Sequence, residues 1–387
     1  MRIGIFGGSF DPVHNEHIRF AETAIGQLRL DRLFVMPAHT PPHKQGKVLT
    51  DDQARLEMCR LAFSKTEKTV VSDYEIANGG TSYTYLTCRH FRSSYPDAEI
   101  FWLVGTDMLR NFYSWKNPDG ILQDVELAVC GRNEETGWEK AAQAEFLQRF
   151  GKKFVFVDFN GAELSSTEAR ILVAAGEELD CLPESVAAYI QRQGLYQMAG
   201  AKAALALQSP SRKAHSLRVA ELAASRAPSL GISEKQAVQA ALFHDCAKNL
   251  ERTDERLKGF QPDPAWGKIP NSVFHQFAGA YLAETAFGVT DGEVLDAIRY
   301  HTSAKPNMSA LGKLIFSADM LEKERRYEGV EILRDLFWSG RDLTPCLTEA
   351  LRQTLIFLKE KNAEIYPLTK AAYAYYAEKT KREGEIL

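Results

Sequence analysis

The first half of this 387-residue chain alternates short apolar runs with helical patterns, and the second half does not. Strand-like runs occur at the chain start and at 32–38, 99–105, 125–131 and 154–159, and amphipathic helical patterns separate them. Strands that alternate with helices pack as a parallel sheet, because each crossover between parallel neighbours needs a helix. The first half is therefore predicted to be a doubly wound α/β domain.

After Tyr196 no convincing strand pattern returns, and helical periods continue toward the end of the chain. We therefore expect an all-α second domain. The expected division is a first domain at 1–197, a connecting segment at 198–210 that resembles a helix more than a floppy linker, and a second domain at 211–387.

Charge and cysteine usage exclude several classes of protein. The 47 basic residues nearly balance the 51 acidic ones, so no nucleic-acid or membrane partner is expected. The six cysteines lie far apart with no CxxC pair, which is typical of neither a zinc cage nor a disulfide framework. With no signal-like start and no long apolar run, a cytoplasmic protein is expected, and homo-oligomer formation is left open.

A glycine turn and two histidines follow the first predicted strand. Gly7 and Gly8 end that strand, and His14 and His17 lie at the start of the next helix. Backbone N–H groups at such a turn and at a helix N-terminus favour phosphate binding, and histidines three apart share one helix face. The spacing fits neither GxGxxG nor GxxxxGK. Two ordinary surface histidines remain an alternative, whereas a metal site lacks a nearby third ligand.

Two further polar segments are expected at the same edge of the sheet. The segment PAHTPPHK carries His43 and Lys44 just after the second strand, and LSSTEAR places Ser166, Thr167 and Arg170 at a helix start. Hydroxyl groups in a first helical turn can also be ordinary caps, but an arginine one turn later favours phosphate binding.

Together these motifs resemble bacterial nicotinate mononucleotide adenylyltransferase, a Rossmann-like nucleotidyltransferase, over residues 1–197. The quoted segments are GGSFDPVHNEH, PPHK, TSYTYLT, GTDML followed by Trp115, LSSTEAR and LPESVAAYIQRQGLY. The resemblance implies transfer of AMP from ATP to nicotinate mononucleotide, with deamido-NAD and pyrophosphate as products and Mg²⁺ as the cofactor.

The resemblance also implies roles for individual residues. Trp115 would stack on the pyridine ring with Thr84 near its carboxylate, and Asp107 would bind the adenosine side. Trp115 could instead be a packing residue. Glu16 stands where the family commonly has glycine, and its carboxylate would repel a triphosphate unless it turned outward. The implied catalytic residues are His14, His17, Lys44 and Arg170, and the implied substrate-binding residues are Gly7, Gly8, Ser9, Phe10, Asp11, His43, Thr84, Gly105, Asp107, Trp115, Ser166 and Thr167.

The second half holds a second pattern of histidines and carboxylates. His244 and Asp245 lie inside an apolar helical stretch, where a charged pair is costly unless it is paired or bound to metal. His215, His275 and His301 flank the pair, and Asp319 lies in another apolar helix. Imidazole and carboxylate ligands suit iron, manganese or zinc. Hydrogen-bonded core histidines are the alternative.

The order H…HD…H…H…D resembles the HD-domain metal hydrolases. ALFHDCAKNL, AIRYHTSAKPNMS and LIFSADMLEKERRYEGVEIL resemble, more narrowly, the bacterial HD-domain symmetrical diadenosine tetraphosphatases. The resemblance implies two transition-metal ions, with iron as first choice, and hydrolysis of diadenosine tetraphosphate to two ADP. One ion would be held by His215, His244, Asp245 and Asp319, and the other by Asp245, His275 and His301.

Two basic residues complete the predicted second site. Asp245 and Lys248 are expected to take part in catalysis, and Arg325 is expected to bind substrate phosphate, although Lys248 and Arg325 could equally be solvated surface charges. The LEKER segment around Arg325 replaces the EPxR usual in relatives.

The sequence thus predicts a bifunctional enzyme. As alternatives, the second domain could be a 5'-nucleotidase, a phosphodiesterase or a regulatory module that binds nucleotide without turnover.

Overall fold

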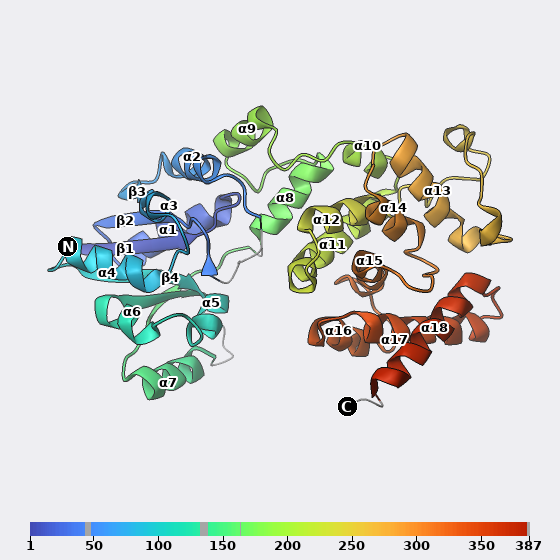
Figure 1. The fold of residues 1–387 in the computed structure, drawn as a ribbon. Coiled ribbons are helices and arrows are strands. Elements are labelled where there is room, and N and C mark those ends of the chain that lie inside the picture. The colour runs from blue at the N-terminus through green and yellow to red at the C-terminus, as the bar shows by residue number, and fades with distance from the viewer. Residues whose placement is uncertain (43–47, 132–137, 163, 385–387) are drawn as a thin grey trace. The chain divides into compact units, whose positions relative to one another are not determined.

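The computed structural model describes residues 1–42, 48–131, 138–162 and 164–384. The chain divides into two compact units, one made of residues 1–169 and 179–195 and the other of 170–178 and 196–387. The first unit contains a parallel sheet with helices and the second is helical (Figure 1), which confirms the predicted fold class. In the described part of the chain, no helix is both long and apolar enough to cross a membrane.

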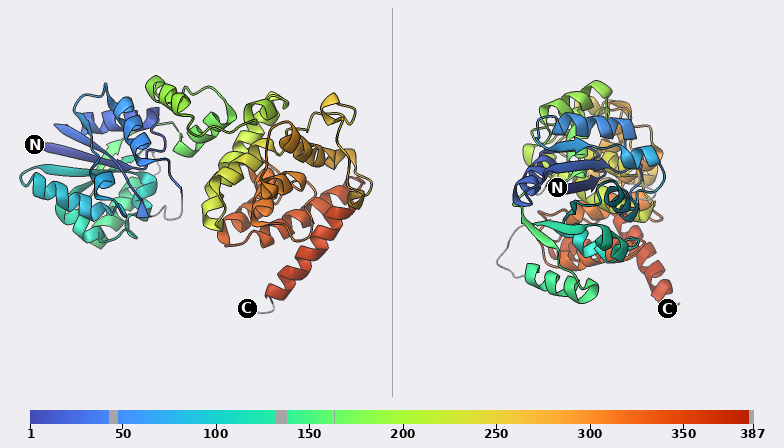
Figure 2. Two further views of the ribbon diagram at one scale, coloured as in Figure 1. Left: turned by 45° about the horizontal axis from the view of Figure 1, so that its top comes forward. Right: turned by 90° about the vertical axis from the view of Figure 1, so that its left-hand side faces the viewer.

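The sheet of unit 1 has the strand order β3-β2-β1-β4-β5-β6, and all of its neighbouring strands are parallel. Its central strands are buried along most of their length, as expected for a sheet covered on both faces (Figure 2). The short strand β3 was not predicted. The strands are β1 Arg2–Gly8, β2 Arg32–Pro37, β3 Thr69–Val71, β4 Glu99–Gly105, β5 Glu126–Gly131 and β6 Val155–Asp158.

The strand order reverses between β1 and β4, which are neighbours in the sheet. In open α/β sheets this switch point opens a crevice at the carboxyl ends of the strands, where ligands bind. Here those ends are Gly8 and Gly105, followed by α1 and α5. The helices up to residue 195 are α1 Asn15–Gln27, α2 Asp52–Phe63, α3 Tyr74–Asn78, α4 Thr84–Ser94, α5 Thr106–Phe112, α6 Pro118–Asp124, α7 Trp138–Phe150, α8 Ser166–Ala175, whose second half belongs to unit 2, and α9 Glu184–Gln193.

Unit 2 is built around one apolar core. The core includes Ile171, Ala174 and Ala175 from the end of α8, and Ala201 and Leu205 from α10 in the expected connecting segment. This packing explains why residues 170–178 group with the helical unit. Its helices are α10 Ala201–Leu205, α11 Pro210–Arg226, α12 Glu234–Phe243, α13 Asn271–Thr285, α14 Gly292–Arg299, α15 Ala310–Leu321, α16 Val330–Ser339, α17 Thr344–Glu360 and α18 Pro367–Gly384.

Candidate active site and metal centre

His14 and His17 lie together at the beginning of α1, beside the switch point. Their ring centroids are 3.6 Å apart, and the backbone N–H of His14 donates to Nδ1 of His17 at 3.1 Å. Because Nδ1 accepts, the proton of a neutral His17 ring lies on Nε2. The two rings therefore lie at the carboxyl edge of the sheet, where a ring N–H can donate a hydrogen bond to a phosphate.

His14 is the more buried of the two, with 5% of its surface exposed. Burial lowers its pKa from 6.5 to about 4, although the nearby Glu16 carboxylate opposes the shift. His14 is therefore neutral near pH 7. Any bond it makes to a phosphate would come from a neutral imidazole N–H, not from a cation.

Glu16 is held by two partners. One carboxylate oxygen accepts from Arg19 Nη1 at 2.7 Å, and the other accepts from the Ala162 backbone N–H at 2.9 Å. These bonds neutralise and anchor the acid that replaces the usual glycine. The expected repulsion of a triphosphate is reduced accordingly.

Buried side chains hold the turn between β1 and α1 in place. The Phe10 ring is 1% exposed and lies 5.1 Å from the His17 ring, so it positions that histidine by packing. Asp11 is 3% exposed and its carboxylate accepts from the Thr50 backbone N–H at 3.3 Å. Ser9 offers its carbonyl oxygen to a buried arginine, Arg55.

Arg55 was not predicted as a site residue, and it is fully buried on α2. Its guanidinium donates to the carbonyl oxygens of Ser9 at 2.7 Å and Thr50 at 2.9 Å, and it pairs with Asp52. Asp52 in turn bonds Nδ1 of His39. An arginine within the apolar pattern of residues 51–63 was the available sequence signal.

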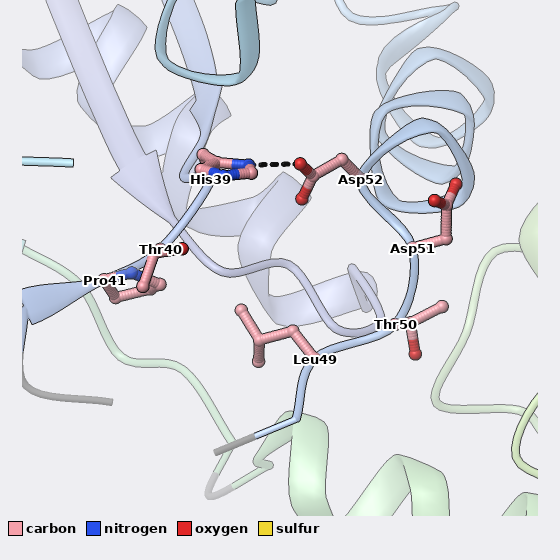
Figure 3. Close-up of a pocket in the computed structure, with 7 residues that line it drawn as sticks. All are labelled: His39, Thr40, Pro41, Leu49, Thr50, Asp51 and Asp52. Atoms are coloured by element: carbon pink, nitrogen blue, oxygen red, sulfur yellow. Dashed lines mark hydrogen bonds and ion pairs between the residues drawn. The ribbon is translucent and has the colours of Figure 1, made fainter. Parts of the chain in front are cut away.

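The Asp52–His39 pair lies in a pocket of about 290 Å³ (Figure 3). The pocket is formed by the two described ends of the segment between β2 and α2. His43 and Lys44, two predicted site residues, lie outside the described residues. The residues that line the pocket are His39, Thr40, Pro41, Leu49, Thr50, Asp51 and Asp52.

The two residues assigned to the nicotinate ring lie on segments that touch. The Lys116 ammonium, next to Trp115, lies 4.2 Å from the ring of Tyr83, which precedes Thr84 at the start of α4. Trp115 is half-buried, and its ring lies 5.3 Å from that of Phe112. The contact with Phe112 gives Trp115 a packing role, and stacking on a substrate ring stays a prediction.

The adenosine side was assigned to the end of β4. The Asp107 carboxylate folds back toward Gly105, where a Cβ would lie only 2.7 Å from Oδ1. Asp107 is exposed in the first turn of α5. Gly105 thus leaves room for this carboxylate at the switch point.

The polar residues at the start of α8, predicted to bind phosphate, lie in different surroundings. Ser166 Oγ donates to the Pro12 carbonyl at 2.9 Å, two residues before His14, which joins α8 to the histidine turn. Ser165 Oγ accepts from the Glu168 N–H at 3.1 Å and is an ordinary cap. Thr167 follows in the same first turn. Arg170 pairs with Glu234 inside unit 2, with Nε 3.1 Å from the carboxylate, so its ATP-phosphate role stays a prediction.

The second predicted site comes together in unit 2. Its residues lie on or just after five different helices, and their imidazoles and carboxylates meet in the core. His215 is on α11, His244 and Asp245 follow α12, His275 is on α13, His301 follows α14 and Asp319 is on α15.

Two of these histidines are oriented by backbone carbonyl groups. Nδ1 of His244 donates to Ala241 O at 2.6 Å, and Nδ1 of His301 donates to Ile298 O at 2.7 Å. In the neutral form of each ring Nε2 then carries a lone pair, as in a metal ligand whose other nitrogen is held. His244 Nε2 is buried without a hydrogen-bond partner in the described structure.

Asp245 lies at the middle of the cluster. Its Oδ1 is 3.4 Å from Nε2 of both His275 and His301, and its Oδ2 is 3.5 Å from Nε2 of His244. Oδ1 is also buried without a hydrogen-bond partner among described groups. Burial alone would raise the pKa of Asp245, but His244 and His301 lower it well below the ordinary value, so the carboxylate is ionised.

His275, His301 and Asp319 have protonation states suited to metal binding. Burial lowers the pKa of His275 well below 6.5, helped by His301 and Lys248, and burial also lowers the pKa of His301. Burial alone would raise the pKa of Asp319, yet bonding to His215 at 2.8 Å and the charge of His244 lower it. Neutral imidazoles and ionised carboxylates are the forms that bind metal. Burial alone would lower the pKa of His244, but Asp245 and Asp319 raise it, so a metal ion at His244 would compete with a proton.

Three overlapping groups have ligand atoms within 4.8 Å of one another, which allows metal binding at adjacent positions. Nitrogen and carboxylate donors with two orphaned buried atoms fit a pair of divalent transition-metal ions and do not fit an apolar core. The groups are His215, His244 and Asp245; His244, His301 and Asp319; and Asp245, His275 and His301.

Three cations surround the cluster. Arg212 Nη1 lies 2.9 Å from Asp245 Oδ2, Lys248 Nζ lies 2.9 Å from His275 Nε2, and Arg325 Nη2 lies 2.8 Å from an Asp319 oxygen. Lys248 and Arg325 were predicted at this site, and Arg212 was missed although it precedes His215 by one helical turn.

Glu322 was also missed as a support for the cluster. It is 2% exposed, bonds Nδ1 of His215 at 3.2 Å and accepts from Arg218 at 2.6 Å. A carboxylate behind a histidine fixes the ring and raises its basicity as a ligand. Glu322, the first glutamate of the LEKER segment, therefore orients His215.

Comparison with known proteins agrees with both halves. The sequence model of the cytidylyltransferase-like family matches residues 5–171, and that of the HD domain matches residues 212–337. A Clostridium tetani protein named "Probable nicotinate-nucleotide adenylyltransferase" is 36% identical over 197 residues, which are 50% of this chain and 98% of the relative.

A second relative spans both halves. The Mycoplasma genitalium protein named "Probable nicotinate-nucleotide adenylyltransferase/Ap4A hydrolase" is 29% identical over 343 residues, which are 86% of this chain and 91% of the relative. Among solved structures, a "predicted HD superfamily hydrolase involved in NAD metabolism" from Clostridium acetobutylicum has 30% identity and a TM-score of 0.41, covering 46% of this chain and 95% of that one.

The identity to the Clostridium protein over nearly its whole length confirms the first resemblance, and the HD match confirms the second. The chain belongs to the nicotinate-nucleotide adenylyltransferase family, and its second half carries an HD domain.

Proposed function

We propose that unit 1 transfers AMP from ATP to nicotinate mononucleotide. The observation that carries this proposal is the pair of adjacent histidines at the switch point of the sheet, with ring centroids 3.6 Å apart. Membership in the adenylyltransferase family supports the choice of substrates.

The reaction needs positioning and charge stabilisation more than acid–base chemistry. A phosphate oxygen of the mononucleotide forms a bond to the α-phosphorus of ATP, and the bond from that phosphorus to the pyrophosphate oxygen breaks. No proton has to move, because the attacking oxygen is already anionic. His17 and His14 donate hydrogen bonds to the phosphates as charge shifts toward pyrophosphate.

Mg²⁺ is proposed to enter with the nucleotide. It is commonly held by substrate phosphates with few protein ligands, and it neutralises phosphate charge when bound. Glu16, anchored by Arg19 and Ala162, leaves the entrance to the histidines less negative.

We further propose that unit 2 hydrolyses diadenosine tetraphosphate symmetrically to two ADP. The carrying observation is the cluster of four histidines and two aspartates with orphaned buried donor atoms. A pair of divalent ions, with iron as first choice, would supply Lewis acidity toward water and phosphate oxygens. The name of the Mycoplasma relative supports the substrate.

In this proposal the chain's own residues hold and aim the reactants. His215, His244, Asp245 and Asp319 would hold one ion, and Asp245, His275 and His301 the other. Three cations that bond to these ligands would offer positive charge to the four phosphates: Arg212, Lys248 and Arg325. The Arg212 guanidinium, for example, lies 2.9 Å from the Asp245 carboxylate. Water attack breaks one phosphoanhydride bond, and each half of the substrate leaves as ADP.

The test uses the full-length protein and identifies every product. With ATP and nicotinate mononucleotide we expect equal amounts of deamido-NAD and pyrophosphate, and with diadenosine tetraphosphate we expect ADP alone. ATP plus AMP would contradict symmetric cleavage. Faster cleavage of AMP or a cyclic nucleotide would favour a nucleotidase or phosphodiesterase, and tight binding without turnover would favour a regulatory module.

Matched variants assign each activity to its site. Asp245→Asn should abolish hydrolysis because the central carboxylate loses its charge, while deamido-NAD synthesis continues. Hydrolysis by Asp245→Asn at the wild-type rate would contradict the proposed metal centre.

A further inference from the structure

Lys248 occupies a special position among the three cations of the HD centre. Its ammonium lies 2.9 Å from Nε2 of His275 and 3.8 Å from Oδ1 of Asp245. Arg212 and Arg325 instead lie closest to carboxylate oxygens, at 2.9 and 2.8 Å, and Arg325 Nη2 lies farther, 3.4 Å, from Nε2 of His215. Among the described residues, the closest partner of the Lys248 ammonium is thus a nitrogen with a single lone pair and not a carboxylate oxygen, and this difference has chemical consequences.

A carboxylate oxygen has two lone pairs, so it can accept a hydrogen bond from an arginine and bind a metal ion at the same time. Nε2 of a neutral imidazole has one lone pair, and it can accept from an ammonium or bind a metal ion, but not both. Nε2 of His275 faces the centre, 3.2 Å from Nε2 of His301 and 3.4 Å from Asp245 Oδ1. The nitrogen that bonds Lys248 is therefore the one that a metal ion would take.

We propose that Lys248 couples metal loading to phosphate binding: a metal ion at His275 displaces the Lys248 ammonium, which then binds the phosphate chain of the nucleotide. The inference rests on the proposed hydrolytic function only in taking a nucleotide phosphate chain as the ligand.

The surroundings of Lys248 allow this movement. The Lys248 side chain is 32% exposed whereas that of Asp245 is 2% exposed, so part of the Lys248 side chain faces solvent at the edge of a buried cluster. Thr302 Oγ1 also lies 2.9 Å from His275 Nε2, and its hydroxyl can rotate away without moving the backbone. A four-carbon stem lets Lys248 move its charge by a few rotamer changes while Asp245 stays in place.

The proposal makes two predictions of opposite sign for Lys248→Met, which keeps the stem and removes the charge. Affinity for Mn²⁺ alone should rise about fivefold or more, because the competing cation is gone. Affinity for ADP at saturating Mn²⁺ should fall about tenfold, the effect of one lost charge-assisted hydrogen bond. Both are measured by calorimetry on the full-length chain.

Two further variants keep the test decisive. Lys248→Arg retains a cation and should bind ADP within about threefold of wild type. Lys258→Met removes an exposed lysine of the same unit and should change neither affinity. Unchanged or weaker Mn²⁺ binding by Lys248→Met would overturn the proposal, as would unchanged ADP binding or a wild type that binds no ADP with Mn²⁺.

The outcome can be separated from that of the proposed function. If the wild type fails to produce ADP from diadenosine tetraphosphate, the substrate assignment is wrong. The opposite shifts in Mn²⁺ and ADP affinity would still support the role of Lys248.

Discussion

His14 and His17 are three residues apart and differ in environment. His14 is buried, with its pKa lowered to about 4, whereas His17 is fixed by the bond from the His14 backbone to its Nδ1. His14 can therefore donate through a neutral ring near pH 7. Because the pKa of His14 lies well below 7, its neutral N–H group persists across the pH range near neutrality.

His17→Ala should lower kcat for deamido-NAD synthesis by about 100-fold to 1,000-fold, the usual cost of one lost donor at a developing charge. The helix should remain folded, because alanine favours helix and the core stays filled. Steady-state kinetics and circular dichroism provide the check, with His90→Ala, an exposed histidine stacked on Tyr74, as the control. Wild-type kcat for His17→Ala would refute the assignment.

The lowered pKa of His14 makes stability depend on pH. Between pH 6.5 and about 4 the unfolded chain binds a proton at this residue and the folded chain does not, so the free energy of unfolding decreases as pH falls. Over the full window the loss is about 3 kcal/mol at most. Urea unfolding at pH 7 and 4.5 should show a smaller loss for His14→Asn than for wild type. An equal loss of unfolding free energy in His14→Asn and in the wild type would contradict this role of His14.

At the scale of elements, apolar runs and helical periods predicted the parallel sheet and the helical half. They missed β3, because Thr69–Val71 is short and only partly buried, and so lacks a strong apolar signal. The candidate metal residues were predictable because charges in apolar helices stand out. Arg55, Arg212 and Glu322 were not, since their importance depends on contacts with residues distant in the sequence.

Two glycines in neighbouring elements should respond oppositely to alanine. A Cβ at Gly7 of β1 would lie 2.8 Å from the Trp102 ring of β4, whereas a Cβ at Gly26 of α1 would meet nothing within 4 Å. Gly7→Ala should lower the free energy of unfolding by about 1 to 3 kcal/mol through overpacking. Gly26→Ala should raise it by about 0.5 to 1 kcal/mol through helix propensity. Denaturant unfolding measures both, and equal shifts would contradict the packing argument.

At the scale of the whole molecule, the candidate residues separate by unit and by donor chemistry. The histidines and glycines of the switch point belong to unit 1, and the metal-ligand groups belong to unit 2. The net charge of −4 gave no sign of anion binding because the relevant charges are local. The first site is proposed to use an ion carried by its nucleotide, whereas the second is proposed to retain its ions through imidazole ligands.

This difference predicts selective recovery after metal removal. The protein is treated with EDTA, the chelator is removed, and either Mg²⁺ or Fe²⁺ is added back. Mg²⁺ should restore deamido-NAD synthesis but not hydrolysis of diadenosine tetraphosphate, because Mg²⁺ prefers oxygen ligands and His215, His244, His275 and His301 offer nitrogen. Fe²⁺, added anaerobically, should restore hydrolysis. Recovery of both activities with Mg²⁺ alone would show that the HD centre does not depend on a nitrogen-preferring metal.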